Sequence, residues 1–348
     1  MDDTSAIAGL ALGADAGQGN LLGIQPWMAL GNYASADRFY DWLAGYFEAA
    51  LRRGWLGPRT VAVLPEYLGA WLVAAGEPAA LFRARRLEQA MLRLALRHPL
   101  MVAAGFARAP AADRARYALF RAKAGRMAAI YSQVFAALAQ RYGATIVAGS
   151  ILLPAPRVVA GRVAGCAGPL QNVAAVFHPN GLADDQLARK RFLTAAEQPF
   201  LAPAEAAPVY ETPAGRMAVL VCADAFYPAS YAALAGRQVR LLAVPSFLEA
   251  AGVWRAPWPG YNGAAAPADV APRDVGAISE RQAWLKYGMA GRIGPASIPY
   301  GVNVFLRGTI LDLGSDGATL LYRRGELAEA PADGPALANV WLDSAPSG

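Results

Sequence analysis

Residues 215–228 read GRMAVLVCADAFYP, and this stretch is the most informative part of the sequence for the fold. Its apolar run over residues 217–221 is short and uninterrupted, which predicts a buried β-strand. Cys222 follows directly at the end of that strand. Strand ends are where α/β folds present reactive groups, because the sheet fixes the backbone while the loop exposes the side chain. Cys222 is therefore a candidate nucleophile.

Apolar runs and amphipathic stretches alternate along the rest of the chain, which is typical of α/β proteins. One helix is expected from the Ser35 cap to Gly54, a second over residues 80–97, and a long third that ends at Gly143. Further strands are expected at residues 21–26, 60–64, 145–150, 172–178, 241–244, 302–306 and 309–313. Residues 249–274 are rich in Trp, Pro and Gly and predict a long irregular loop.

The chain of 348 residues has two histidines, His98 and His178, and two cysteines, Cys166 and Cys222. Their spacing does not fit a zinc site, and their number excludes a disulfide scaffold, so we expect no metal and a cytoplasmic location. The sequence also lacks the G-x-S-x-G elbow of a serine hydrolase. A cysteine nucleophile in this chain would need a carboxylate as its base, because a free thiol is mostly protonated at neutral pH.

Glu66 and Lys190 also lie at or near the ends of predicted strands. Glu66 follows the apolar residues 60–64 and one proline, so it is well placed to act as the base for Cys222. A lysine beside the thiol would favour the thiolate and could stabilise an oxyanion, an effect of about 2–4 kcal/mol.

These residues lie in three motifs, VLPEY at 63–67, NVAAVFHPNG with ARKRFL at 172–193, and GRMAVLVCADAFYP at 215–228. In this order the motifs resemble those of the nitrilase superfamily of carbon–nitrogen hydrolases. YGATIVAGS at 142–150 and VPSF at 244–247 support the resemblance. Each motif alone is weak, whereas the ordered set is specific.

The resemblance implies a four-layer αββα sandwich of two mixed sheets, assembled as a homo-oligomer, expected to be a dimer, and working without a cofactor. It implies that Glu66, Lys190 and Cys222 are catalytic and that the backbone N–H of Ala223 helps to hold the oxyanion. Glu197, seven residues after Lys190, is a candidate second carboxylate. Two further residues, Asp224 and Tyr67, are expected to have structural roles near the site.

Asp224, two residues after the cysteine, resembles the amidase and carbamoylase branches of the superfamily. Three residues depart from the family pattern: Phe192 replaces a histidine, Ala223 an aromatic residue and Ala229 a glutamate. The resemblance implies hydrolysis of a small non-peptide amide or nitrile through a thioester. Two alternatives remain: an N-acyltransferase that uses the same thioester, and a catalytically silent binding protein on the same fold.

We expect a loose tail over residues 1–20, without the basic start of a signal peptide, and one domain over residues 21–345. Two insertions, near 78–115 and 249–275, interrupt the family pattern in that domain. Residues 78–126 hold eleven Lys and Arg and two acidic residues, a charge of +9, so the remainder of this +6 chain carries −3.

The basic insertion has several interpretations. Residues 80–106 could form a basic amphipathic surface for an anionic membrane, with apolar side chains over residues 100–106. Alternatively, these residues form the solvent-facing side of a lid or dimer-contact helix, or a site for an anionic or acyl-chain substrate. Nucleic acid is not expected as a partner, because the chain has no known binding module and no aromatic platform.

Overall fold

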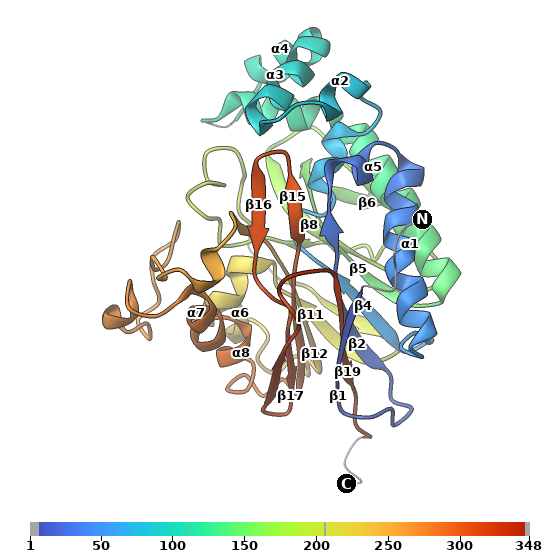
Figure 1. Cartoon of the computed structure of the whole chain (residues 1–348), viewed down its shortest axis with the longest axis vertical. Coiled ribbons are helices and arrows are strands. Elements are labelled where there is room, and N and C mark those ends of the chain that lie inside the picture. The colour runs from blue at the N-terminus through green and yellow to red at the C-terminus, as the bar shows by residue number, and fades with distance from the viewer. Residues whose placement is uncertain (1–6, 111, 205–206, 345–348) are drawn as a thin grey trace.

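The computed structural model describes residues 7–110, 112–204 and 207–344, and its centre is a pair of mixed β-sheets packed face to face (Figure 1). The first sheet has the order β1 (Ala8–Leu12), β19 (Ala336–Trp341), β2 (Asn20–Gln25), β4 (Thr60–Leu64), β5 (Thr145–Pro154), β8 (Leu170–Phe177) and β9 (Ala188–Arg189). The second has the order β10 (Val209–Thr212), β11 (Gly215–Val219), β12 (Leu241–Ser246), β14 (Tyr300–Phe305), β17 (Leu320–Arg323) and β18 (Glu326–Glu329).

Both sheets mix parallel and antiparallel pairs. In the first sheet β2 and β4 are parallel and β5 and β8 antiparallel, and in the second β11 and β12 are parallel and β14 and β17 antiparallel. The sheets approach so closely that a Cβ added to Gly23 on β2 would lie 2.7 Å from the Val302 side chain on β14. Glycine is therefore required at this contact between the two sheets.

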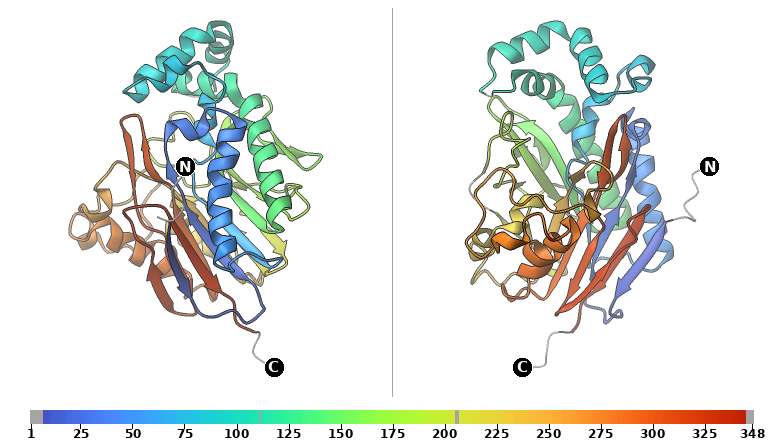
Figure 2. Two further views of the ribbon diagram at one scale, coloured as in Figure 1. Left: turned by 45° about the vertical axis from the view of Figure 1, so that its right-hand side comes forward. Right: turned by 60° about the vertical axis from the view of Figure 1, so that its left-hand side comes forward.

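Helices cover the outer face of each sheet (Figures 1 and 2). α1 (Ala36–Arg52) and α5 (Arg114–Tyr142) pack on the first sheet, and α6 (Pro228–Ala232), α7 (Glu280–Tyr287) and α8 (Met289–Arg292) pack on the second. The four-layer αββα sandwich expected from the sequence is thus confirmed. Within the described residues, no helix has both the length and the apolar character to cross a membrane.

The helix boundaries follow from local sequence. The Ser35 side chain accepts a hydrogen bond from the Arg38 N–H and so caps α1, whose buried face carries Phe39, Leu43 and Phe47. α5 ends at Tyr142 and is capped by Gly143, which has a φ of 60°, a conformation that glycine adopts without strain.

Three segments differ from the sequence-based expectations. Residues 8–12, expected to belong to a loose tail, form β1, which pairs with β19 at the edge of the first sheet. The helix expected over residues 80–97 is broken into α2 (Ala79–Phe82) and α3 (Leu87–Arg97), and α4 (Pro99–Ala107) follows. The strand expected over residues 217–221 ends at Val219, because a 3₁₀ turn, η4 (Cys222–Phe226), begins with Cys222.

The remaining short elements lie around this frame. They are β3 (Trp27–Met28), η2 (Leu30–Tyr33), η3 (Ala70–Ala74), β6 (Arg157–Val159), β7 (Arg162–Ala164), β13 (Leu248–Glu249), η5 (Val253–Arg255), η6 (Pro272–Asp274), β15 (Arg307–Ile310) and β16 (Leu313–Asp316). Residues 249–274 are otherwise irregular, as their composition predicts.

Candidate functional site

The candidate site lies where strands of the two facing sheets end. Glu66 follows β4 in the first sheet, and Cys222 follows β11 in the second. Lys190 comes directly after the short strand β9, and its backbone N–H donates to Asn172 O at 2.9 Å. The side chains of these residues and of Glu197 are all buried. Four of the candidate residues from the sequence thus lie at one place in the fold.

Lys190 holds two carboxylates together. Its Nζ lies 2.8 Å from Glu66 Oε1 and 2.9 Å from Glu197 Oε1. Asn172 on β8 is hydrogen-bonded to both carboxylates as well. Its Nδ2 donates to Glu66 Oε1 at 2.8 Å and to Glu197 Oε1 at 3.3 Å. A buried ion pair is stable only when hydrogen bonds satisfy its remaining atoms, and Asn172 supplies some of these bonds.

A bulge in β5 fixes the turn that carries Glu66. The register of β5 against β8 shifts between Val147 and Ser150, and Gly149 within this bulge has a φ of 69°. A Cβ on Gly149 would lie 2.3 Å from Pro65 O, so glycine alone allows this close approach. The next residue, Ser150, accepts a hydrogen bond from the Tyr67 N–H at 2.8 Å.

Tyr67 contacts the site through its hydroxyl group, which donates to Glu197 Oε1. The other oxygen of Glu197 accepts from the Thr194 N–H at 2.9 Å. The Tyr67 ring packs edge-on against Phe247, with the ring centroids 5.5 Å apart. Tyr67 therefore fixes the position of Glu197, in addition to packing beside Glu66.

Cys222 has an unusual backbone conformation. Its φ is 52°, in the left-handed region that residues other than glycine rarely adopt. The thiol donates to Phe247 O over 3.6 Å, and Glu66 lies close enough for its charge to raise the pKa of the thiol. Ala223 is the second residue of η4, and N–H groups in the first turn of a helix have no partner within the helix. The Ala223 N–H is therefore suited to binding an anion.

Asp224 ties the loop of Lys190 to the turn of Cys222. Its carboxylate accepts from the backbone N–H groups of Phe192 at 2.8 Å, Arg191 at 3.0 Å and Val221 at 3.3 Å. Burial raises the pKa of Asp224 to about 7, although these N–H donors act in the opposite direction.

Burial and charge set the proton positions in the site. Burial raises the pKa of Glu66, and the charge of Glu197 adds to this effect, while Lys190 opposes it. Burial also acts to raise the pKa of Glu197. The charge of Lys190 and the hydrogen bonds from Lys190, Tyr67 and Thr194 outweigh burial and hold the pKa of Glu197 below its usual value.

The cation and the thiol have shifted pKa values as well. Burial lowers the pKa of Lys190, but the charges of Glu197 and Glu66 outweigh this and raise it well above its usual value. Burial, followed by the charge of Glu66, raises the pKa of the Cys222 thiol well above its usual value. The resting site therefore holds an ammonium group and a neutral thiol at neutral pH.

The second insertion, residues 249–275, packs against the loops of the site. Asn262 Oδ1 accepts from the Ala195 N–H at 3.0 Å, and the Tyr261 hydroxyl donates to Phe226 O at 2.8 Å.

Phe192, which replaces the family histidine, stacks on Tyr227 with the ring centroids 3.7 Å apart.

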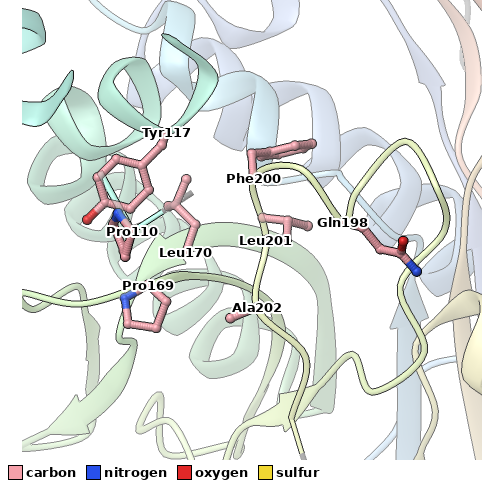
Figure 3. A pocket seen from close by; sticks show the side chains of 8 residues that line it. All are labelled: Pro110, Tyr117, Pro169, Leu170, Gln198, Phe200, Leu201 and Ala202. Carbon is pink, nitrogen blue, oxygen red and sulfur yellow. The ribbon is translucent and has the colours of Figure 1, made fainter. Parts of the chain in front are cut away.

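A cavity of about 40 Å³ lies beside the segment that follows Glu197 (Figure 3). Its lining residues are Pro110, Tyr117, Pro169, Leu170, Gln198, Phe200, Leu201 and Ala202. Pro110 precedes α5 and Tyr117 lies in its first turns, Pro169 and Leu170 lie at the start of β8, and the other residues belong to the loop after Glu197. In the described part of the chain, no group of three or more His, Cys, Asp or Glu residues could hold a metal ion.

Asn172 is a residue of the site that the sequence motifs did not single out, although it begins the second motif. A polar residue at the start of an otherwise apolar strand was the available signal, because a buried amide needs polar partners. Two other residues lie apart from this cluster: His178 pairs with Asp184 at 3.2 Å in the turn after β8, and Cys166 lies in the connection before β8.

Known proteins resemble this chain in sequence pattern and in fold. A model of the carbon-nitrogen hydrolase family matches residues 33–269. A solved mutant of the Nesterenkonia AN1 amidase, from the nitrilase superfamily, has a TM-score of 0.55 at 15% identity, covering 94% of this chain and 92% of that one.

Other structures of the Nesterenkonia sp. AN1 amidase are also similar. One mutant with acrylamide added at its active-site cysteine has a TM-score of 0.55 at 14% identity, with 93% of both chains covered. Another mutant, in complex with butyramide, has a TM-score of 0.56 at 14% identity, with 93% of this chain and 91% of that chain covered. No curated protein sequence matches the chain. The structural matches share the fold, and the family match covers most of the sequence, so the chain belongs to the carbon-nitrogen hydrolase family.

Proposed function

We propose that the chain is a cysteine-dependent amidase that hydrolyses a small non-peptide amide through a thioester on Cys222. One observation carries this proposal: the buried Cys222 lies beside Glu66, whose charge raises the pKa of the thiol, and Glu66 is bridged by Lys190 to a second buried carboxylate, Glu197. Acyl transfer by a cysteine requires a nucleophile, a base that takes its proton and a group that stabilises the oxyanion, and Cys222, Glu66 and Lys190 can fill these roles.

In the first step the Cys222 sulfur attacks the amide carbon as the thiol proton moves to Glu66. The pKa of the thiol is high, so little thiolate exists at rest and the base must act during the attack. The pKa of Glu66 is raised, which brings it closer to the operating pH and improves this proton transfer.

The negative charge that develops on the carbonyl oxygen needs donors. Lysine has three N–H donors, and the Nζ of Lys190 lies within 2.9 Å of Glu66 Oε1 and of both oxygens of Glu197. The ammonium group of Lys190, which would give up one of these contacts, and the Ala223 backbone N–H would then bind the oxyanion. Donors of this kind contribute about 2.7–4 kcal/mol each to catalysis.

The tetrahedral intermediate collapses when Glu66 returns its proton to the nitrogen. The C–N bond breaks, ammonia or an amine leaves, and the acyl group remains on Cys222 as a thioester. Glu66 then takes a proton from water as the water oxygen attacks the thioester carbon. The carboxylic acid leaves, and the proton returns to Cys222.

A small amide is the proposed substrate class; a small nitrile remains the alternative expected from the sequence. The similar amidase structures contain acrylamide or butyramide, both of which are short uncharged amides. Cys222 in this chain is buried, which also favours a small substrate. Assembly as a homo-oligomer and location in the cytoplasm stay predictions.

An N-acyltransferase is the second candidate, in which an amine replaces water in the last step. The exposed apolar side chains of the first insertion favour it, because they offer a surface for an acyl-chain substrate. Asp224 opposes it, since its position resembles the amidase branch. An acylated amine in the products, in place of the free acid, would identify the transferase.

Release of ammonia from a panel of small amides tests the amidase proposal. The wild-type protein should release ammonia together with the free acid, and Cys222→Ala should abolish both products. Cys166→Ala is the matched control, because Cys166 lies outside the site, and this variant should retain activity. Full turnover by Cys222→Ala would exclude the mechanism, and a lack of turnover with every amide would favour a silent binding protein.

A further inference from the structure

The first insertion forms a cap at one end of the molecule. α2, α3 and α4 follow one another over residues 79–107 and stand beyond the ends of the sheets, against the N-terminal part of α5 (Figures 1 and 2). We call these residues the cap. Its outward surface is not required by the proposed chemistry of Cys222.

The cap exposes large apolar side chains. α4 has the sequence PLMVAAGFA, without a charged or polar side chain, and its Leu100 and Met101 are 84% and 53% exposed. On α3, Leu92 and Leu96 are 60% and 70% exposed. These two residues are four positions apart, so they lie on the same face of the helix. Phe106 of α4 is 47% exposed and adds an aromatic ring to the apolar surface.

Packing inside the cap determines which face points outward. Ala90 and Leu94 are buried, and they line an apolar cavity between α3 and Trp71 of the body. Gly105 of α4 fits so closely against α5 that a Cβ there would lie 3.0 Å from Ala118. The inner faces are therefore already occupied, and the exposed leucines belong to the faces that remain.

A buried carboxylate fixes the cap to the body. Glu77 accepts a hydrogen bond from Lys123 of α5 and lies 2.9 Å from His98 Nε2, at the junction of α3 and α4. Arg97 at the end of α3 contacts the same carboxylate at 3.3 Å. Asp312 Oδ1 also accepts from the Leu87 N–H at 2.7 Å. The apolar surface is thus held in a defined orientation.

The cap that carries this apolar surface also has an excess of positive charge. Residues 79–107 contain five arginines and one acidic residue, Glu88. Arg83, Arg85, Arg86 and Arg93 are exposed, and the described part of the chain provides no carboxylate in ion-pair contact with them. Charge of one sign around apolar side chains is complementary to a surface that is anionic outside and apolar below.

We propose that the cap docks the chain on an anionic lipid membrane. α3 and α4 would lie in the plane of the interface, with Leu96, Leu100 and their apolar neighbours inserted about 5–10 Å, as in interfacial helices generally. The exposed arginines would bind lipid phosphates. An anionic bilayer supplies negative charge everywhere around the inserted helices, so every exposed arginine can find a phosphate there.

Vesicle co-sedimentation of the full-length protein tests this proposal. One set of vesicles contains phosphatidylcholine alone, and the other contains phosphatidylcholine mixed with phosphatidylglycerol. We expect binding to the anionic set, with a marked loss on adding salt, because salt screens exposed charges. The double variants Leu96→Gln with Leu100→Gln, and Arg85→Gln with Arg86→Gln, should each weaken binding by more than about tenfold.

Matched controls lie on other surfaces. Leu327 on β18 is exposed, as are Arg157 and Arg162 in the β6–β7 hairpin. Leu327→Gln, and Arg157→Gln with Arg162→Gln, should bind as the wild type does. An unchanged Tm would show that each cap variant is folded.

Three results would overturn the proposal. They are no binding to anionic vesicles, equal binding to both vesicle sets, and binding that the cap variants leave unchanged. Size-exclusion chromatography with light scattering identifies the competing occupant: a dimer that Leu96→Gln with Leu100→Gln dissociates would assign the cap to a second copy of the chain. Amidase activity on soluble amides is measured separately, so failure of the docking proposal is distinguishable from failure of the proposed function.

Discussion

Lys190 Nζ lies 2.8 Å from Glu66 Oε1, and both groups are buried where the two sheets meet. The two residues are 124 positions apart in the sequence. Glu197 contacts the same ammonium group, so one cation balances two carboxylates. The charge of Lys190 favours the ionised form of Glu66, which can accept a proton, while burial keeps the pKa of Glu66 above its usual value.

The first prediction concerns Glu66 as the base. Glu66→Gln keeps the size of the side chain and its hydrogen bond to Lys190, but removes the atom that accepts the thiol proton. We expect kcat/KM for a small amide to fall by about 10²–10⁴-fold, the usual contribution of general base catalysis. Steady-state kinetics measure this, with Tm as the check on folding. A fall of less than about tenfold would show that another group accepts the proton.

The second prediction concerns the stability of the buried cluster. Lys190→Met leaves Glu66 and Glu197 buried without their cation, and breaking a buried pair in this way costs about 3–5 kcal/mol of unfolding free energy. Urea unfolding measures the change. The control is Glu211→Gln, because the Glu211–Arg216 pair is exposed and its loss should cost less than about 1 kcal/mol. Equal costs for the two variants would contradict the account of the cluster.

The third prediction makes Tyr67 a positioning residue. Tyr67→Phe removes the hydroxyl that donates to Glu197 but keeps the ring that packs on Phe247. A hydrogen bond to a charged group is worth about 1.5–3 kcal/mol, so we expect kcat to fall by about tenfold or more. KM should change little, and the acid limb of the pH profile should shift, because Glu197 affects the pKa of Glu66. A purely structural role would lower Tm without shifting the pH profile.

The fourth prediction concerns pH. Glu66 acts as a base only when ionised, and burial raises its pKa above 4.5. Activity should therefore be lost as the pH falls through this raised pKa, and the acid limb of kcat/KM should lie above pH 4.5.

Asp224, with a pKa raised to about 7 by burial, is the group most easily confused with Glu66 in that profile. In Asp224→Asn the limb that belongs to Glu66 should persist. If the limb disappears in this variant, Asp224 and not Glu66 controls the acid side of the profile.

The elements and residues that the sequence predicted are those with local signals. The Ser35 cap, the glycine after α5 and the short apolar runs of the sheets depend on neighbouring residues, and the structure has them nearly where expected. The ordered motifs likewise led to Glu66, Lys190 and Cys222, which the fold brings together.

Other features depend on contacts between residues far apart in the chain. β1 exists because β19, more than three hundred residues later, provides an edge for pairing, and no local pattern in residues 8–12 reveals this. The hydrogen bonds of Asn172 to Glu66 and of Tyr67 to Glu197 span 106 and 130 positions. Composition and periodicity describe neighbours along the chain, so they could not predict these bonds.

The most direct test of the account is the mass of the peptide that contains Cys222 after acid quenching of the reaction with a small amide. The account predicts an added mass equal to the acyl group on this peptide at the earliest quench times, and an unmodified Cys166 peptide. Ammonia release in the first turnover with an unmodified Cys222 peptide, or an acyl group on Cys166, would contradict it.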